Sequence, residues 1–265
     1  MVTIDVPGSE IVGLRANNPG ILSLGGTNSW VVERDPAWIV DPGPSLDEHV
    51  AALRTAVQRR GGLGGIALTH DHVDHTEAVG ALLEAFPGTP VLAGRGPASS
   101  RLVDGERYGP LLAVATPGHT QDHFGFLCGR VLFSGDAVLG EGSVFIAPDS
   151  GALAGYLAAL ERLRALSPSI ICPGHGPLVL DADAKLAEYL EHRLERERLL
   201  LEALEQGART PDDLLNRAWS DVAPQLRPAA AVTLVAHLDK LDDEGRLPAG
   251  VRRPALPAWL TSHPH

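Results

Sequence analysis

The sequence predicts a mixed α/β (α+β) fold, in which a four-layer αββα sandwich is followed by a small helical domain. Two observations lead to this class. Strand-like apolar segments fall into two antiparallel-rich blocks with helical segments interspersed. From about residue 183 glycine becomes sparse, and leucine, glutamate and arginine dominate up to residue 206, as expected of one long helix. We therefore predict one domain in residues 1–182 and a second in residues 183–265.

The first block of strands begins with hairpins. We predict strands at residues 12–14, 21–24, 29–32 and 38–40, with turns at residues 18–20 and 25–26. Residues 45–58 then form an amphipathic helix, in which Ser45 is the expected N-cap and Glu48 follows at capping-box spacing. A strand at residues 65–68 and a short helix at residues 76–86 complete this half.

The second block has strands near Val91 and Ala113 and at residues 124–128, 131–133 and 170–171, with a helix at residues 153–166. In the C-terminal domain, Thr210 and Pro211 are typical of the N-cap and first position of a helix. Residues 228–243 fit a further helix. Residues 245–248 and 251–253 fit two short strands that would form a wing.

The composition favours a cytoplasmic protein. The chain has 265 residues, a formal net charge of −11 and only two cysteines, Cys128 and Cys172, which provide no disulfide framework. Its first residues lack the features of a signal peptide, and no segment approaches the roughly 20 apolar residues of a membrane span. We therefore expect no membrane partner. The acidic charge disfavours non-specific binding to nucleic acid, which is mostly electrostatic.

The segment that carries most chemistry is Thr69-His70-Asp71-His72-Val73-Asp74-His75. It places three imidazoles and two carboxylates directly after an apolar strand. Imidazole nitrogen and carboxylate oxygen are the ligands that suit zinc and similar cations. His70 and His72 are two residues apart, so they lean the same way at the end of a strand, whereas Asp74 and His75 can face a second ion. This spacing predicts a metal site.

Three further segments have the same design of strand, glycine and potential ligand. His119 follows Gly118, Asp136 follows Gly135, and His175 follows Gly174, each after an apolar run. Glycine permits a sharp turn, so the next side chain can point into a cleft. Residues at the ends of strands remote in sequence can converge on one site. Cys172 is interpreted as a small buried residue.

These motifs resemble the metallo-β-lactamase superfamily, and every metal position of its two-metal form is present. The resemblance implies a four-layer αββα sandwich in which His70, His72 and His119 hold one zinc ion. It implies that Asp74, His75 and His175 hold a second zinc ion and that Asp136 bridges the two, although other divalent metals are possible. Histidine at position 72 favours zinc and hydrolysis over di-iron redox chemistry. The resemblance also assigns Asp41 to the support of the metal loop.

Longer matches resemble the β-lactamase-like protein 2 family over most of the chain. They include Asp122 and His123 after the third histidine ligand, the sequence 139–142 after Asp136, and a helix with Tyr189, His192 and Arg193. This family implies endoribonuclease activity on single-stranded RNA and a C-terminal winged helix. The third helix of that module carries one lysine against three aspartates, so we expect it to cap the cleft and not to read DNA.

We therefore expect a hydrolase that uses a hydroxide bridging two zinc ions. Asp136 bridges the ions, Asp74 orients the hydroxide, and His123 is the candidate proton donor to the leaving group, with structural support as its alternative role. The substrate is single-stranded RNA or, alternatively, a small thioester or lactone, as in the glyoxalase II branch. Candidate cations of an RNA cleft are Arg95, Arg101, Arg107 and Arg193. The sequence does not predict the oligomeric state.

Overall fold

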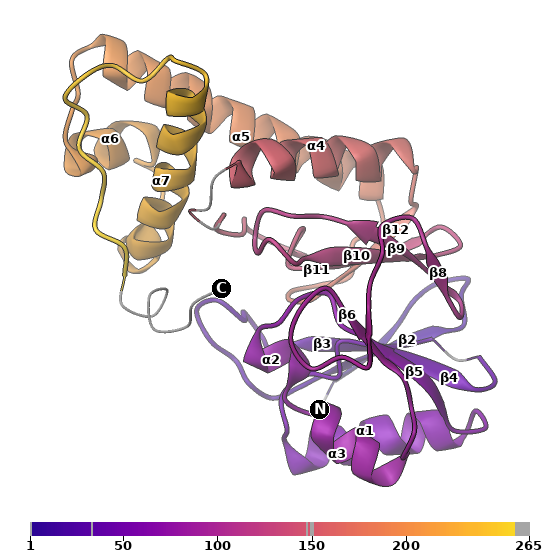
Figure 1. Cartoon of the computed structure of the whole chain (residues 1–265). Helices are drawn as coiled ribbons and strands as arrows, with labels where there is room; N and C mark the ends of the chain where they lie inside the picture. Colours follow the sequence, from indigo (N-terminus) through magenta and orange to yellow (C-terminus); the bar gives the residue numbers. More distant parts are fainter. Residues whose placement is uncertain (1, 33, 147, 149–150, 258–265) are drawn as a thin grey trace.

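The computed structural model describes residues 2–32, 34–146, 148 and 151–257 of the chain. Two β-sheets are stacked, helices cover the outer faces, and a further group of helices lies to one side (Figure 1). The predicted α/β (α+β) class, the four layers and the C-terminal helical part are confirmed. Residues 258–265, the end of the predicted C-terminal domain, lie outside the described residues.

The first sheet contains seven strands in the order of the chain. They are β1 (Val2–Asp5), β2 (Ile11–Arg15), β3 (Asn28–Val32), β4 (Ala37–Val40), β5 (Leu63–Ala67), β6 (Val91–Ala93) and β7 (Ser100–Arg101). The strands from β1 to β4 pair antiparallel, and those from β4 to β7 pair parallel. β5 is buried in the middle of this parallel part, and the His-rich segment follows it directly.

The second sheet has the order β12-β11-β10-β9-β8. Its strands are β8 (Arg107–Tyr108), β9 (Leu111–Ala115), β10 (Phe124–Cys128), β11 (Val131–Gly135) and β12 (Ile170–Pro173). Because β10 is antiparallel to both neighbours and β12 is parallel to β11, the strands β9, β11 and β12 all run in one direction. The residues that follow these three strands therefore meet at one edge.

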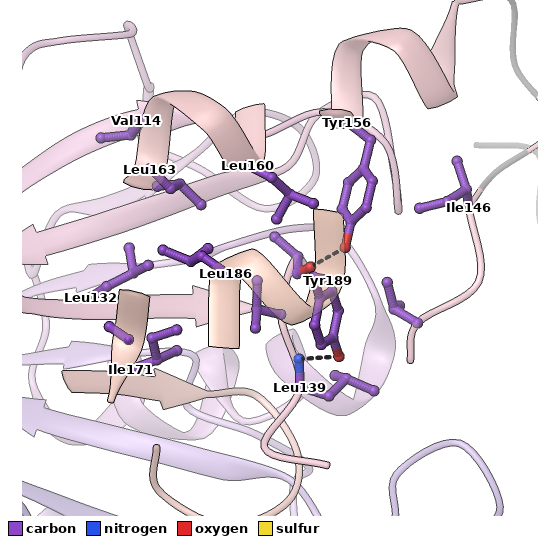
Figure 2. Packing of buried hydrophobic residues seen from close by; sticks show 14 of the residues in the cluster. Val114, Leu132, Leu139, Ile146, Tyr156, Leu160, Leu163, Ile171, Leu186 and Tyr189 are labelled. Atoms are coloured by element: carbon purple, nitrogen blue, oxygen red, sulfur yellow. Dashed lines mark hydrogen bonds between the residues drawn. The ribbon is translucent and has the colours of Figure 1, made fainter. Parts of the chain in front are cut away.

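Three hydrophobic cores hold the layers together. Trp30, Phe126 and Phe133 are fully buried between the two sheets. The helices α1 (Asp47–Gln58) and α3 (Val79–Ala85) cover the first sheet, and α4 (Ala152–Ala165) and α5 (Ala182–Glu205) cover the second. Figure 2 shows how Leu160 and Leu186 from these last helices pack over Leu132 and Ile171. Full burial of each such side chain contributes about 2 kcal/mol.

The C-terminal module has its own core. The helices α6 (Pro211–Ala218) and α7 (Arg227–Asp243), with a short 3-10 turn at Pro224–Leu226, pack on the second half of α5. The first half of α5 belongs to the core over the second sheet, so one helix joins both parts (Figure 1). The boundary after residue 182 falls at the first turn of α5 and remains a prediction. Thr210 caps α6 as predicted, because its side chain accepts the N–H of Asp213.

Two predictions in the first half were wrong because tertiary contacts replaced local signals. Ser45 is not the N-cap of α1; that residue is Leu46, and the Ser45 N–H donates to the Glu77 carboxylate at 3.0 Å. Residues 21–24 form a turn with one isolated bridge, since β2 already pairs with β1 and β3 on its two sides. β1 was not predicted.

Two further predictions need correction. The helix expected at residues 76–86 consists of α2 (Val73–Thr76) and α3. Gly43 separates them, because its N–H donates to the His75 carbonyl and its carbonyl accepts the Ala78 N–H. The predicted wing contains no strand in the described residues 244–257. The Arg252 N–H instead donates to the Arg209 carbonyl, and Leu247 packs on the module core.

Candidate metal centre and adjoining cavity

The predicted ligands converge at the strand edge described above. His70 and His72 follow β5, His119 follows β9, Asp136 follows β11 and His175 follows β12. Asp74 and His75 lie on the short helix α2. Three groups of donors approach each other closely: His70, His72 and His119; His70, His75 and Asp136; and Asp74, His75 and His175. All seven predicted ligands are therefore brought together, from four separate segments of the chain.

The first donor group consists of three imidazoles. His72 Nδ1 lies 2.9 Å from His70 Nε2 and 3.2 Å from His119 Nε2. Neighbouring ligands in a tetrahedral zinc shell with bonds of about 2.0–2.1 Å are roughly 3.3 Å apart. The spacing of these nitrogens therefore fits one small cation. His70 and His119 are buried, and burial lowers the pKa of each well below the ordinary value, so both rings are neutral and able to coordinate.

The second donor group combines imidazole and carboxylate. His75 Nε2 and His175 Nε2 are 3.3 Å apart, and Asp74 Oδ2 lies 3.4 Å from His175 Nε2 and 3.8 Å from His75 Nε2. Burial lowers the pKa of His75, but the carboxylates of Asp136, Asp74 and Asp41 outweigh it and raise the pKa to about 10. This part of the site therefore attracts positive charge strongly, and a metal cation would satisfy the same carboxylates as a proton.

Asp136 lies between the two groups. Its Oδ2 is 3.7 Å from His119 Nε2 and 3.4 Å from His175 Nε2, and its Oδ1 is 3.6 Å from His75 Nε2. Although burial favours a neutral carboxyl, His175 and His75 hold the pKa of Asp136 well below its usual range. Oδ1 is buried and has no hydrogen-bond partner. An unsatisfied buried anion is costly unless a cation binds it, so the donor set fits two metals with Asp136 shared.

The far nitrogens of the histidines are held by oxygen acceptors. His75 Nδ1 contacts Asp41 Oδ2 at 2.9 Å, and His119 Nδ1 contacts the Phe145 carbonyl at 3.2 Å. Nδ1 of His70 contacts the Thr69 hydroxyl, which in turn donates to Asp41 at 2.7 Å. These contacts fix each ring so that Nε2 faces the centre. The predicted support of the metal loop by Asp41 is confirmed.

Two residues that the sequence analysis did not assign complete the support. The Thr27 hydroxyl donates to Asp74 Oδ2 at 3.1 Å, and the Arg15 guanidinium donates to the carbonyl of Gly176 beside His175. Thr27 is 47 residues from Asp74, so no local pattern relates them. Gly174 is required by close packing, because a Cβ there would lie 2.5 Å from Asp136 Oδ1.

His123 is buried directly behind Asp136. Its Nε2 accepts the Asp136 backbone N–H at 3.1 Å, and its Nδ1 lies 2.7 Å from the Thr116 hydroxyl. Burial lowers the pKa of His123 to about 3, so the ring is neutral and both nitrogens are occupied. This geometry favours the alternative role of structural support over proton donation. Cys172 is buried between the sheets, where burial raises the pKa of its thiol, and it belongs to none of the donor groups.

Comparison with known proteins identifies the family. Residues 22–97 and 100–175 match the family model of the metallo-beta-lactamase superfamily, and residues 210–248 match that of the beta-lactamase associated winged helix domain. The chain belongs to the metallo-β-lactamase superfamily. Members of this superfamily are typically hydrolases, so the predicted resemblance and enzyme class are confirmed.

Similar proteins carry different names. A "Beta-lactamase-like protein 2 homolog" from Caenorhabditis elegans is 30% identical over 89% of this chain and 85% of its own length. The "Atrochrysone carboxyl ACP thioesterase nsrC" from Aspergillus novofumigatus is 31% identical over 95% of this chain and 76% of its own length. A solved β-lactamase domain protein from Burkholderia ambifaria has a TM-score of 0.75, at 19% identity, and covers 92% of this chain and 88% of its own chain. The last likeness concerns the fold alone.

A cavity of about 570 Å³ lies between the metallo-β-lactamase domain and the winged helix. His119 and Asp136 line it on the metal side, and α5, α7 and the 3-10 turn line it on the other. Most of its surface is apolar; this includes Leu139, Phe145 and Trp219. The exposed side chains of Ile21 and Leu22, in the turn that replaced the predicted strand, also border it.

The winged helix is tied to the metal centre through residues 137–146. The hydroxyl of Tyr156 donates to the Ala137 carbonyl at 2.6 Å, and that of Tyr189 accepts the Leu139 N–H at 2.9 Å (Figure 2). Further along, Thr233 of α7 accepts the Ile146 N–H. The same segment supplies the Phe145 carbonyl to His119. Residues 137–146 therefore connect α4, α5 and α7 to the carbonyl that contacts His119.

The predicted cleft arginines separate into two sets. Arg95, Arg101 and Arg107 are exposed and do not line the cavity, whereas Arg193 is buried at its wall. The cavity wall also includes Arg196, which forms two 2.7 Å hydrogen bonds with Asp221.

Within the described residues, no helix combines the length and apolar character needed to cross a membrane.

Proposed function

We propose that this chain is a two-metal hydrolase of small acyl thioesters. The observation that carries the proposal is the largely apolar cavity that begins at His119 and Asp136 and is closed by the winged helix. Its volume of about 570 Å³ suits a compact ligand. We assign the acyl group to this cavity, with the reacting carbonyl at the His119–Asp136 end.

In the reaction, the oxygen of water adds to the thioester carbonyl carbon and the carbon–sulfur bond breaks, which gives a carboxylate, a thiol and a released proton. Two bound divalent cations, held by the seven predicted ligands, would lower the pKa of water and stabilise the oxyanion. The free oxygen of Asp74 orients the attacking water, while Thr27 holds this carboxylate in place. Asp41 and the Phe145 carbonyl keep His75 and His119 oriented.

The leaving group supports a thioester in particular. Both nitrogens of His123 are engaged, so this residue is a poor proton donor. A thiolate is a good leaving group because the pKa of a thiol is only about 8.5, whereas an alkoxide leaving from RNA needs a proton or a cation. The relative named as an ACP thioesterase accords with this choice. Lactones would use the same cavity and acyl chemistry, but their alkoxide leaving group makes them less favoured than thioesters.

Cleavage of single-stranded RNA is the second candidate, as implied by the resemblance to the β-lactamase-like protein 2 family, of which a homolog is among the relatives. The charge of the cavity argues against it. Of the two arginines in the described wall, Arg196 is paired with Asp221, which leaves Arg193 as a single cation against the many charges of an RNA backbone, and Glu141 and Glu188 add negative charge. We propose that the winged helix does not read DNA, because α7 is largely buried and carries three aspartates.

A direct comparison of substrates tests the proposal. The purified protein is loaded with zinc, and two bound ions per chain are verified by elemental analysis. N-acetylcysteamine thioesters of aryl-substituted acids and a quenched fluorescent single-stranded RNA are then supplied to the parent and to Asp136→Ala. We expect the parent alone to hydrolyse the thioesters. Cleavage of RNA by the parent, without thioester hydrolysis, would replace the proposal with the second candidate.

A further inference from the structure

Arg193 is the buried cation of the cavity wall. It lies on α5, its side chain is 2% exposed, and its guanidinium is 5.4 Å from the centre of the Tyr156 ring. Among the described residues its guanidinium donates to the Val144 carbonyl and interacts with the Tyr156 hydroxyl. Within the same residues its Nε has no hydrogen-bond partner and no carboxylate forms an ion pair with it. In the described part of the chain, Arg193 is therefore a buried charge without a counter-ion.

Arg196, the second arginine of the cavity wall, has a carboxylate partner, unlike Arg193. Arg196, one helical turn away, has both terminal nitrogens on Asp221 and a third contact from Nε to His192. The nearby Glu188 is exposed and pairs with Lys185. Each of these acids thus has its own partner. A buried unpaired charge is unfavourable, and an anion bound beside it offsets much of that cost.

We infer that Arg193 forms an anion subsite of the cavity and that the acyl group of the natural substrate carries a carboxylate in addition to its thioester. This inference rests on the proposed thioester hydrolysis. The apolar wall would hold the body of the acyl group, and Arg193 would select its anionic end by a charge-assisted hydrogen bond. The planar guanidinium suits carboxylate recognition.

A structural role is the competing explanation for Arg193. Its bond to Val144 holds the segment whose next carbonyl, that of Phe145, contacts His119. If this were its whole role, substitution would disturb the metal centre and slow all substrates alike. A carboxylate subsite makes a different prediction, because kcat/KM would fall further for substrates with the second anion than for those without it.

The experiment compares matched pairs of N-acetylcysteamine thioesters. In each pair the acyl chain ends in a carboxylate or in a methyl ester, across a series of chain lengths and with an aryl body. We expect wild-type protein to prefer the carboxylate at one length by at least about tenfold in kcat/KM. Arg193→Met should abolish that preference, so that kcat/KM falls further for the carboxylate than for the ester, whatever loss the two share through the Val144 contact. Arg193→Lys, which keeps the charge, should retain part of it. Arg198→Met, which removes an exposed arginine of the same helix outside the cavity, is the matched control.

A binding measurement separates this inference from the proposed function. The free dicarboxylic acids, which lack a thioester, are titrated by calorimetry into metal-free protein, where no metal can hold them. Binding that is lost in Arg193→Met supports the subsite even if no thioester is cleaved. Hydrolysis of thioesters without any carboxylate preference would overturn the subsite and leave the function standing. Equal losses for both members of each pair in Arg193→Met would also overturn it.

Discussion

At the scale of single residues, orientation decides what the centre can do. Asp41 accepts hydrogen bonds from Thr69 and contacts His75, so one carboxylate fixes two parts of the metal loop. It has a φ of +52°, which is unusual for a residue other than glycine and indicates that its position is enforced by these contacts. The geometry of the ligands therefore depends on a residue that holds no metal.

Substitution of Asp41 tests this dependence. In Asp41→Asn we expect the affinity for zinc to fall about 10–100-fold, because the imidazole of His75 loses its carboxylate partner. Competition with a chromophoric chelator measures the effect. Asp47→Asn, an exposed site in α1 with the same change of charge, is the matched control. Equal affinities in the two variants would contradict the orienting role.

The bridging position of Asp136 gives a second prediction. Asp136→Ala should lose one or both metals and all hydrolysis, while its far-ultraviolet circular dichroism remains that of the parent. The reason is that the Asp136 carboxylate approaches His119 of the first donor group and His175 of the second. Full activity in this variant would exclude the role assigned to Asp136.

The seven donor residues could be predicted from sequence because each lies beside a glycine or within the dense 69–75 segment. The residues that orient these donors could not be predicted in this way. Thr27 reaches Asp74, and Asn28 donates to the carbonyl of Pro173, 145 residues away. Such contacts depend on how two sheets stack, which no local spacing contains. The burial of Arg193 is of the same kind, since an arginine on a helix is ordinarily exposed.

At the scale of elements, the long helices were predicted well, α5 from its run of leucine, glutamate and arginine, and α6 from Thr210 and Pro211 at its start. Short elements were predicted less well. The helix at residues 76–86 is interrupted since Gly43 inserts its backbone between α2 and α3. The wing lacks strands since its residues pair with Arg209 and pack on the module core. In both cases, contacts with residues remote in sequence determined the local backbone structure.

His237 makes the stability of the C-terminal module depend on pH. It is buried in α7 against Trp219, and neither ring nitrogen has a hydrogen bond. Burial, with Arg193, Lys240, His192 and Arg196 nearby, lowers its pKa well below the ordinary value of 6.5. The unfolded chain therefore binds a proton below pH 6.5 that the folded chain refuses, so folding stability is lost as the pH falls.

We expect His237→Leu to remove this loss. Between pH 7.5 and 5.5 the wild type should lose about 1.4 kcal/mol more stability than the variant, since one proton is bound on unfolding. Urea titrations of both proteins at the two pH values, with metal removed, measure the difference. An identical loss in both would show that His237 is protonated within the fold.

At the scale of the whole molecule, the metal centre joins segments from residue 70 to residue 175, and the winged helix closes the cavity beside it. The net charge of −11 disfavours binding of nucleic acid to the molecule as a whole. Within the cavity, the ion pair between Arg196 and Asp221 removes one of the cations that could bind a phosphate. The cavity itself could not be predicted, because it arises where two independently packed cores meet on α5.

Metal should also stabilise the fold. With free zinc at 100 times the dissociation constant, each occupied site adds about 2.7 kcal/mol to the free energy of unfolding. We therefore expect chelation to lower the Tm of the parent and to change that of Asp136→Ala much less. Differential scanning calorimetry with and without a chelator measures both. An equal shift in the two proteins would place the stabilising metal elsewhere.

The central claim is that the centre and the cavity together hydrolyse acyl thioesters. The most direct measurement is the release of thiol from aryl-acyl N-acetylcysteamine thioesters by protein with two verified metal ions per chain, beside Asp136→Ala under the same conditions. We expect saturable release of thiol by the parent and none by the variant. No release by the parent, with both ions bound and RNA cleaved in the same preparation, would contradict it.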